Sequence, residues 1–168
     1  KIFFSRVRCI FYAGASLPQP IWDRLQAVAV KTIGHRVIMM SGLGSTETAP
    51  GAITVARTID RAGTVGVPMP GVELKLIPND GKLEARLRGP NIMPGYWKNA
   101  EQTQKVFDEE GFYKLGDALK FANPAEPDAG FVFDGRIAED FKLTTGTWVS
   151  VGPLRADLIH HYEPLIRD

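Results

Sequence analysis

The sequence has almost no cysteine and almost no net charge, and each shortage excludes a class of function. Cys9 is the one cysteine, which excludes an internal disulfide and a cysteine metal cage. It lies in an apolar run, so we expect a buried, unreactive thiol. Twenty Lys and Arg against 19 Asp and Glu leave a net charge of +1, too little to attract nucleic acid or acidic lipid. Any phosphate ligand therefore needs a local site.

Long hydrophobic runs are missing as well. The apolar stretch 7–15 is interrupted by Arg8 and is far too short to cross a bilayer, and no charged-then-apolar leader opens the chain. We therefore expect a cytoplasmic protein. Hydrophobic residues make up 44% of the sequence, enough to build a core. Because the chain begins at Lys1 without methionine and stops just after a helical pattern, we expect an internal segment of a longer protein.

The first part of the chain has the order strand, helix, strand, loop. Residues 7–13 are β-branched and aromatic and predict a strand that ends in the loop Gly14-Ala15-Ser16. A second short strand is predicted over 37–40, followed over 41–48 by a loop of small and hydroxylic residues. This order is typical of a parallel sheet whose ligand lies at the carboxyl ends of its strands.

A helix is predicted between these two strands. Pro18 and Pro20 open it, and Gly34 is placed to end it. Its expected buried face carries Ile21, Leu25, Val28 and Ala29. The tryptophans are expected to be packing residues: Trp22, Trp97 and Trp148.

After residue 63 the sequence consists of short runs separated by glycine and proline. Two of these runs flank Asn79-Asp80-Gly81 and predict a β-hairpin. The further elements expected are a helix at 101–107, strands at 112–121, 131–133 and 147–151, and a final helix carrying Leu154, Leu158, Ile159 and Tyr162. The middle of the chain should therefore be a small β-rich unit.

The run Gly44-Ser45-Thr46-Glu47-Thr48 follows a predicted strand and has two interpretations. A glycine lets the backbone approach a phosphate, hydroxyl and free N–H groups can bind its oxygens, and a carboxylate can hold Mg²⁺. The same residue types suit a solvated turn that leads into a helix N-cap. Taken alone, the run favours the turn.

The other motifs of the chain, taken in order, favour the phosphate site. They are Tyr12-Ala13-Gly14-Ala15-Ser16-Leu17-Pro18 before the run, and Gly63-Thr64-Val65-Gly66-Val67-Pro68, Pro70-Gly71-Val72-Glu73, Arg88-Gly89-Pro90, Gly95-Tyr96-Trp97, Gly116-Asp117 and Gly135-Arg136 after it. In this order they resemble the adenylate-forming superfamily of acyl-CoA synthetases, adenylation domains and luciferases. The resemblance covers essentially the whole chain, and its specificity lies in the ordered set.

Within that superfamily the sequence most resembles feruloyl-CoA synthases. The resemblance is carried by the stretches 44–50, 108–113, 134–143 and 146–152. The stretch 134–143 is the most discriminating. Most relatives have a lysine-aspartate pair soon after the Gly-Arg, where this chain has Ala138-Glu139-Asp140.

The resemblance implies an α/β fold in three parts. Residues 1–62 would be the end of the parallel-sheet subdomain of the large AMP-binding domain, and residues 63–139 its β-rich subdomain. Residues 140–168 would be the hinge and the truncated start of the small α+β C-terminal domain. The family's Gly/Ser/Thr-rich phosphate loop and C-terminal lysine would lie outside this segment, so the segment alone should be a poor catalyst.

The resemblance also implies roles for single residues. Thr46 would contact the nucleotide phosphate and Glu47 would bind Mg²⁺, and these two are the expected catalytic residues. Asp117 would accept hydrogen bonds from the ribose hydroxyls, and Arg136 would contact ribose or phosphate; a carboxylate suits a diol and a guanidinium suits an anion. The alternatives are a turn aspartate after Gly116 and a surface ion pair.

Further nucleotide contacts are implied at two places. Gly14-Ala15-Ser16 would form one wall of the adenine pocket, because small side chains leave a slot for a flat ring. Plain loop geometry also accounts for Ser16. Leu43, Gly44 and Ser45 would contact the nucleotide as well. The family usually has an aromatic residue at the position of Leu43, and leucine supplies dispersion without ring stacking.

The hinge of the family falls on one of two acidic residues. Counting forward from Arg136 favours Glu139, whereas counting back from Gly146 favours Asp140. We prefer Asp140, since the glycine is the firmer landmark. A solvated acidic turn would have the same sequence.

The implied activity is that of an AMP-forming acid-thiol ligase. A carboxylic acid would react with ATP and Mg²⁺ to give acyl-AMP, and CoA would then accept the acyl group. We expect an aromatic, hydroxycinnamate-like or feruloyl-like acid. The alternatives are a fatty acyl-CoA ligase or a nucleotide-binding or interaction module without catalysis. We expect no nucleic acid and no membrane insertion, and we leave a homodimer open.

Overall fold

The computed structural model describes residues 2–14, 17–139, 141–149 and 151–166. Its elements, in chain order, are β1 (Cys9–Phe11), α1 (Gln19–Ile33), β2 (Ile38–Met40), β3 (Gly42–Leu43), the 3₁₀ turn η1 (Thr46–Thr48), β4 (Ile53–Thr54), β5 (Thr64–Pro68), β6 (Glu73–Asn79), β7 (Lys82–Arg88), α2 (Ala100–Val106), β8 (Tyr113–Phe121), η2 (Pro127–Ala129), β9 (Phe131–Arg136), β10 (Phe141–Lys142), β11 (Trp148–Val149) and α3 (Val151–Tyr162). Among the described residues, no helix is long and apolar enough to cross a membrane.

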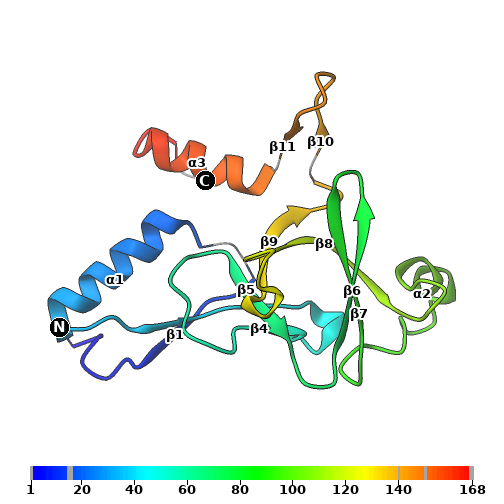
Figure 1. Cartoon of the computed structure of the whole chain (residues 1–168), viewed down its shortest axis with the longest axis horizontal. Helices are drawn as coiled ribbons and strands as arrows, with labels where there is room; N and C mark the ends of the chain where they lie inside the picture. The colour runs from blue at the N-terminus through cyan, green and yellow to red at the C-terminus, as the bar shows by residue number, and fades with distance from the viewer. Residues whose placement is uncertain (1, 15–16, 140, 150, 167–168) are drawn as a thin grey trace.

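The first unit is a parallel strand pair with α1 beside it (Figure 1). β1 pairs in parallel with β2, from Cys9 opposite Ile38 to Phe11 opposite Met40. The amide of Tyr12 donates to the carbonyl of Met40 at 3.0 Å and extends this pairing by one residue. The predicted parallel arrangement is therefore confirmed. The first strand is shorter than the predicted 7–13.

Helix α1 begins and ends where the sequence predicts, but its buried face is different. Gly34 adopts a left-handed φ of 82° and its amide caps the carbonyl of Val30. The buried residues are Trp22, Gln26 and Ala29, whereas the predicted face residues Ile21 and Val28 are 38% and 50% exposed.

The cause is a polar pair that hydrophobic periodicity cannot detect. The Gln26 amide donates to the carbonyl of Val37 at 2.8 Å and accepts from the amide of Val37 at 3.1 Å. These two hydrogen bonds to the backbone of Val37, just before β2, turn the Gln26 side of the helix inward. Residues at i−4 and i+3 of Gln26, namely Trp22 and Ala29, are buried with it.

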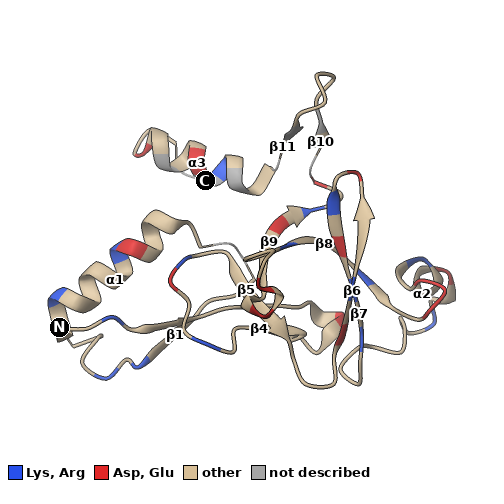
Figure 2. Ribbon diagram, in the orientation of Figure 1, with Lys and Arg blue, Asp and Glu red and all other residues tan. Residues whose placement is uncertain are grey.

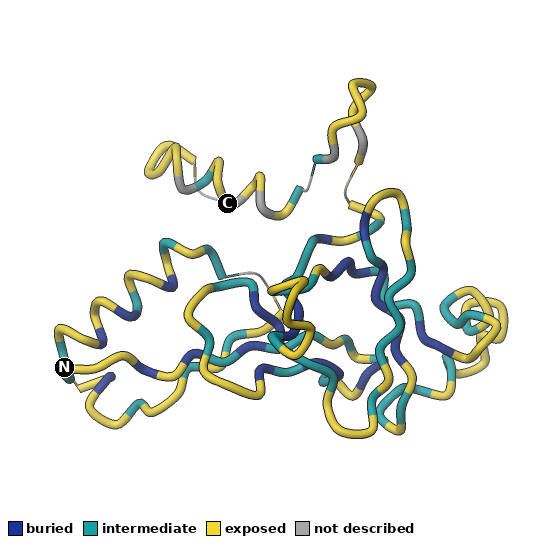
Figure 3. The backbone as a smooth tube through the Cα atoms, viewed as in Figure 1, coloured by how far each residue is buried: buried dark blue, intermediate teal, exposed yellow. Residues whose placement is uncertain are grey.

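The second unit is a seven-stranded sheet in the order β3-β4-β5-β9-β8-β7-β6, in which every neighbouring pair is antiparallel. The predicted hairpin is confirmed as β6 and β7. Asp80 and Gly81 at its tip have φ of 49° and 85°, as a two-residue type I′ turn requires. Figure 3 shows that buried residues lie along the strands of this sheet. The hydrophobic core of the sheet consists of Ala52, Ile53, Val65, Ala85, Leu87, Leu119 and Phe131. The α/β class is confirmed.

Several expectations about single residues need correction. Cys9 is exposed, because the outer side of β1 is uncovered. Trp22 is 1% exposed and packs as expected, but Trp97 is 88% exposed and is no core residue. The predicted strand over 147–151 is only β11, since Val151 already begins α3. The side chain of Trp148 lies outside the described residues.

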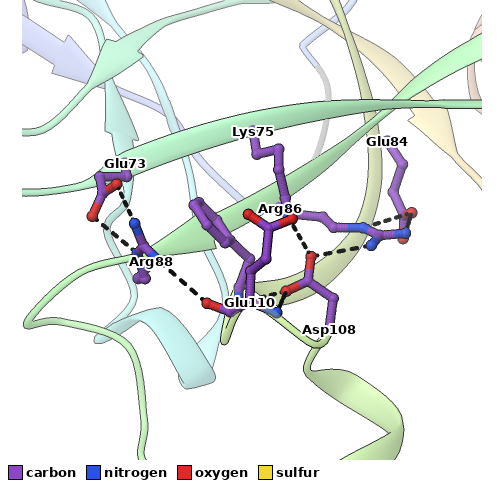
Figure 4. A network of polar contacts seen from close by, with 8 residues as sticks. Glu73, Lys75, Glu84, Arg86, Arg88, Asp108 and Glu110 are labelled. Carbon is purple, nitrogen blue, oxygen red and sulfur yellow. Dashed lines mark hydrogen bonds and ion pairs between the residues drawn. The ribbon is translucent and has the colours of Figure 1, made fainter.

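Charges of both signs are interspersed along β6 to β9, consistent with the small net charge (Figure 2). On one face of the β6–β7 hairpin they form a network around Asp108 (Figure 4). Asp108 accepts from Lys75 at 2.7 Å and from Arg86 at 3.2 Å. Its other oxygen accepts from the amide of Phe112 at 2.9 Å, and the Phe112 ring lies 4.3 Å from the cations of both Lys75 and Arg88.

This network determines how β8 starts. Burial pushes the pKa of the Asp108 carboxyl up, but the bonds from Lys75, the Phe112 amide and Arg86 outweigh it and hold the pKa well below its usual range. The carboxylate therefore stays ionised and fastens the turn 108–112 to the hairpin. Because β8 begins at Tyr113, the network also fixes the strand that carries Asp117.

Candidate functional site

The predicted loop 41–48 joins the two sheets. Ser41 lies between β2 of the parallel pair and β3 of the seven-stranded sheet, and the chain then makes the 3₁₀ turn η1. The hydroxyl of Thr48 accepts from the amide of Ser45 at 2.9 Å and donates to the carbonyl of Ser45 at 3.0 Å. The local structure is thus the capped turn that was one of the two interpretations. A turn of this kind also leaves Thr46 exposed to a ligand.

A glycine is required at position 44 for a different reason from the one expected. A Cβ built on it would lie 2.1 Å from the carbonyl oxygen of Pro50 and 2.8 Å from the Thr48 hydroxyl. The missing side chain therefore lets the chain fold back on itself around η1. Close approach to a phosphate is not needed to explain this glycine.

Glu47 is held by a residue that the sequence analysis gave no role. Its Oε1 accepts a hydrogen bond from the Tyr96 hydroxyl at 2.8 Å, and its carbonyl accepts from the amide of Met93 at 2.8 Å. The hydrogen bond from Tyr96 lowers the pKa of Glu47, which keeps the carboxylate ionised. The same bond is the main reason that the pKa of Tyr96 is raised to about 12.

Asn91 was also missed. Its Nδ2 donates to the carbonyl of Thr48 at 3.0 Å and to the carbonyl of Gly51 at 2.6 Å, which fastens the loop after η1. The only signal in the sequence was its position between the motifs Arg88-Gly89-Pro90 and Gly95-Tyr96-Trp97. Neither motif predicts hydrogen bonds to residues 40 and 43 positions earlier in the chain.

Asp117 and Arg136 are directly paired partners on the neighbouring strands β8 and β9. Their side chains meet at 3.5 Å between Asp117 Oδ1 and Arg136 Nε, and Arg136 Nη1 lies 3.7 Å from Glu139 Oε1. Asp117 is buried and lies within a strand, so the alternative of a turn aspartate is wrong; Arg136 is exposed and does form an ion pair. A buried carboxylate beside an exposed guanidinium suits an anionic ligand with hydroxyl groups.

The environment of Asp117 disfavours its charge. Burial raises the pKa of the carboxyl to about 6, the Arg136 charge opposes this rise and the Glu139 charge adds to it. A carboxylate that is costly to bury without a full set of partners is a candidate for a ligand-binding group.

Tyr113 lies on the same strand as Asp117, and the charges of Glu47 and Asp117 both act on it. The Tyr113 side chain is buried at the start of β8, and burial is the main reason that the pKa of its hydroxyl is raised. The charges of Glu47 and Asp117 raise this pKa further, whereas the Ser45 hydroxyl lowers it. The Ser45 Oγ is buried and makes no hydrogen bond of ordinary geometry within the described part of the chain, although it lies close to Tyr113 and Glu47. The fold thus brings together residues about 70 positions apart in the sequence.

Of the remaining predicted site residues, the structure describes Gly14, Leu43 and Glu139. Gly14 is exposed just after β1, at the carboxyl end of the parallel pair, and Leu43 is half-buried against the core of the seven-stranded sheet. Glu139 is exposed in the turn after β9 and its amide donates to the carbonyl of Arg136. Ala15, Ser16 and Asp140 lie outside the described residues. The adenine wall and the hinge stay predictions, as does the division at 62 and 139.

Glu47 is the carboxylate of the candidate cation site. Within the described residues, no group of three or more His, Cys, Asp or Glu side chains could hold a metal ion. A single ionised carboxylate, Glu47, fits Mg²⁺ that is bound mainly by phosphate oxygens and water, because Mg²⁺ commonly uses one or two protein carboxylates together with a substrate phosphate. It does not fit a metal held by the protein alone.

Comparison with known proteins gives the relationships of the chain. A family profile described as "AMP-binding enzyme" matches residues 2–97. A Humulus lupulus protein named "Probable CoA ligase CCL8" is 29% identical over 164 residues, covering 94% of this chain and 25% of that protein. A malonate–CoA ligase of Arabidopsis thaliana is 28% identical over 160 residues, covering 93% and 25%. The chain thus spans about a quarter of the length of these curated relatives.

Solved structures agree on the fold. The anthranilate CoA ligase AuaEII in complex with anthranoyl-AMP matches with a TM-score of 0.70 and 26% identity, covering 92% of this chain and 29% of that one. The acids in the names of the relatives differ widely. They include malonate, 4-coumarate, a long-chain fatty acid and anthranilate.

Proposed function

The chain belongs to the AMP-binding enzyme family, and from this premise we propose that the protein containing it is an ATP-dependent acyl-CoA ligase. The observation that carries the proposal is a pair of carboxylates in two different settings: Glu47 in η1, held by the Tyr96 hydroxyl, and the buried Asp117, paired with Arg136 on the neighbouring strand. One suits a cation beside phosphates, and the other suits a ribose diol. A nucleotide that reaches from one to the other would use both.

In the first half-reaction the acid would attack the α-phosphate of ATP, releasing pyrophosphate and forming acyl-AMP. The η1 turn would bind phosphate oxygens through the Thr46 hydroxyl and backbone N–H groups, while Asp117 and Arg136 would orient the ribose. Mg²⁺ held by Glu47 would supply positive charge beside the phosphates. The protein's part is to hold charge in position, which accounts for a site without a side-chain nucleophile.

In the second half-reaction the CoA thiol would attack the acyl carbonyl and displace AMP. The hinge predicted at Glu139 or Asp140 would reorient the small domain between the two steps. Arg136 contacts Glu139 and Asp117 from one guanidinium. Nucleotide site and predicted hinge are therefore joined by one side chain. We retain the proposal of a cytoplasmic enzyme.

For the acid we propose an aromatic, feruloyl-like or hydroxycinnamate-like carboxylate. Support comes from the stretch 134–143, which resembles feruloyl-CoA synthases, and from the likeness to a ligase bound to anthranoyl-AMP.

A panel of acids tests the class. The full-length protein should form CoA thioesters from ferulate, 4-coumarate and related aromatic acids with kcat/KM at least about tenfold above that for malonate or for medium- and long-chain fatty acids, which is a difference of about 1.4 kcal/mol in transition-state binding. Thioester formation is followed by chromatography for each acid under the same conditions. A preference for malonate or for fatty acids would contradict the aromatic assignment and leave the ligase assignment intact.

A further inference from the structure

The segment 88–97 contains two motifs of the sequence analysis that the proposed nucleotide contacts do not use. In the structure this segment runs along η1 and makes four hydrogen bonds to residues 47–51. Two come from Asn91 and fasten the backbone after the turn. The other two, from Met93 and Tyr96, both end on Glu47.

Glu47 is thus held at both ends. Met93 fixes its backbone carbonyl, and the Tyr96 hydroxyl fixes one oxygen of its carboxylate. A glutamate side chain has three rotatable bonds, and a free one loses rotamer entropy when a ligand orders it. The two contacts supply that order before any ligand binds.

Tyr96 is itself anchored. Its amide donates to the Thr103 hydroxyl at 2.9 Å, and this hydroxyl donates to the carbonyl of Asn99 at 2.8 Å, which ties Tyr96 to the first turns of α2. Gly95 has a φ of 150°, and a Cβ there would lie 2.7 Å from Thr103 Cγ2. Only glycine lets the chain pass Thr103 so closely, and this path directs Tyr96 toward Glu47.

We propose that Tyr96 is a positioning residue that holds the Glu47 carboxylate in the orientation required for a divalent cation. The inference rests on the proposed function, because the cation matters only if Glu47 faces nucleotide phosphates. Tyr96 does not touch substrate in this account. It donates to Oε1 of Glu47, and the second oxygen would face the cation and its water shell.

A purely structural role for Tyr96 predicts a different effect of removing its hydroxyl. In that case the hydroxyl would contribute only to stability, and its loss would lower the melting temperature without changing the affinity for a cation. The two accounts differ in a property that can be measured without any turnover.

The test is binding of Mn²⁺ to the full-length protein in the presence of α,β-methylene-ATP, whose carbon bridge prevents pyrophosphate from leaving the α-phosphate. Water proton relaxation measures the protein-bound ion. The variants are Tyr96→Phe, which removes only the hydroxyl, Glu47→Gln, which removes the charge, and Thr103→Val, which keeps the Tyr96 hydroxyl but removes its anchor. Tyr162→Phe on α3 is the matched control, since Tyr162 is exposed and lies outside the site.

We expect Tyr96→Phe to weaken Mn²⁺ binding about tenfold, as loss of a positioning bond to a metal ligand does elsewhere. Thr103→Val should weaken it less, Glu47→Gln should weaken it most, and Tyr162→Phe should leave it unchanged. Wild-type affinity in Tyr96→Phe would overturn the proposal, as would wild-type affinity in Glu47→Gln or no binding by the wild type. The measurement needs no acid, so a protein that shows this order of affinities but forms no thioester from any acid of the panel would contradict the ligase proposal alone.

Discussion

Asp117→Asn in the full-length protein is expected to weaken ATP binding roughly 10- to 100-fold and, at about pH 8, to raise the melting temperature. The two effects have one cause. Burial makes the charged form of this carboxylate costly to the folded protein, and in our proposal its charge serves the ribose hydroxyls. Asparagine keeps the shape but loses the charge, and with it the stronger hydrogen bonds that a carboxylate accepts from ribose hydroxyls.

The pH dependence follows from the sign of the shift. The pKa of Asp117 is raised to about 6 in the folded protein, above the value of about 3.9 in an unfolded chain. The folded state therefore holds the proton more tightly, and its stability falls as pH rises from about 4 to about 6. Above about pH 6 the cost is complete, on the order of 1–3 kcal/mol. Asparagine avoids this cost, so its advantage should disappear below about pH 4.

The measurements are ATP affinity by calorimetry and melting temperature at a series of pH values. Asp128→Asn is the matched control, because Asp128 is exposed in η2 and outside the site. Unchanged ATP affinity in Asp117→Asn would contradict the ribose assignment. A fall in melting temperature would show that the carboxylate is a structural group.

The second large effect is expected for Glu47→Gln. Acyl-AMP formation should fall by roughly 10²- to 10³-fold, the scale of losing one preorganised charge interaction at a reacting phosphate. Folding should be nearly unaffected, since the glutamine amide can still accept from the Tyr96 hydroxyl through its oxygen. Single-turnover formation of acyl-AMP is the measurement, with KM for the acid as a second readout.

The control for this variant is Glu101→Gln, which removes an exposed carboxylate paired with Lys105 on α2. Such exposed pairs contribute about 0.3–0.5 kcal/mol, so this variant should resemble the wild type. Equal rates for Glu47→Gln and Glu101→Gln would contradict the cation role of Glu47.

The sequence predicted the elements of the fold well because they depend on local signals. Gly34 ended α1, the Asn79-Asp80-Gly81 turn closed the β6–β7 hairpin, and the order strand, helix, strand led to the parallel pair. Details that depend on distant polar contacts could not be predicted. The rotation of α1 depends on a bond between Gln26 and the backbone of Val37, which no apolar periodicity contains.

In the candidate site, too, local motifs could be predicted from the sequence and distant polar contacts could not. Thr46, Glu47, Asp117 and Arg136 were predicted from motifs, and the structure places Asp117 opposite Arg136 on neighbouring strands. Tyr96 and Asn91 were missed as contacts of the site because they act across more than 40 residues of sequence. Gly44 was found for an incomplete reason, since it is the carbonyl of Pro50 that requires a glycine there. Trp97 looked like a core residue only because tryptophan usually is one.

The central claim, that this segment carries the nucleotide half of an acid-activating site, is tested most directly by exchange of labelled pyrophosphate into ATP. The full-length protein should catalyse the exchange only when ATP, Mg²⁺ and a carboxylic acid are all present, and omission of any one should return it to background. Background exchange across a broad panel of aromatic, fatty and dicarboxylic acids, or exchange that does not depend on an acid, would contradict the claim.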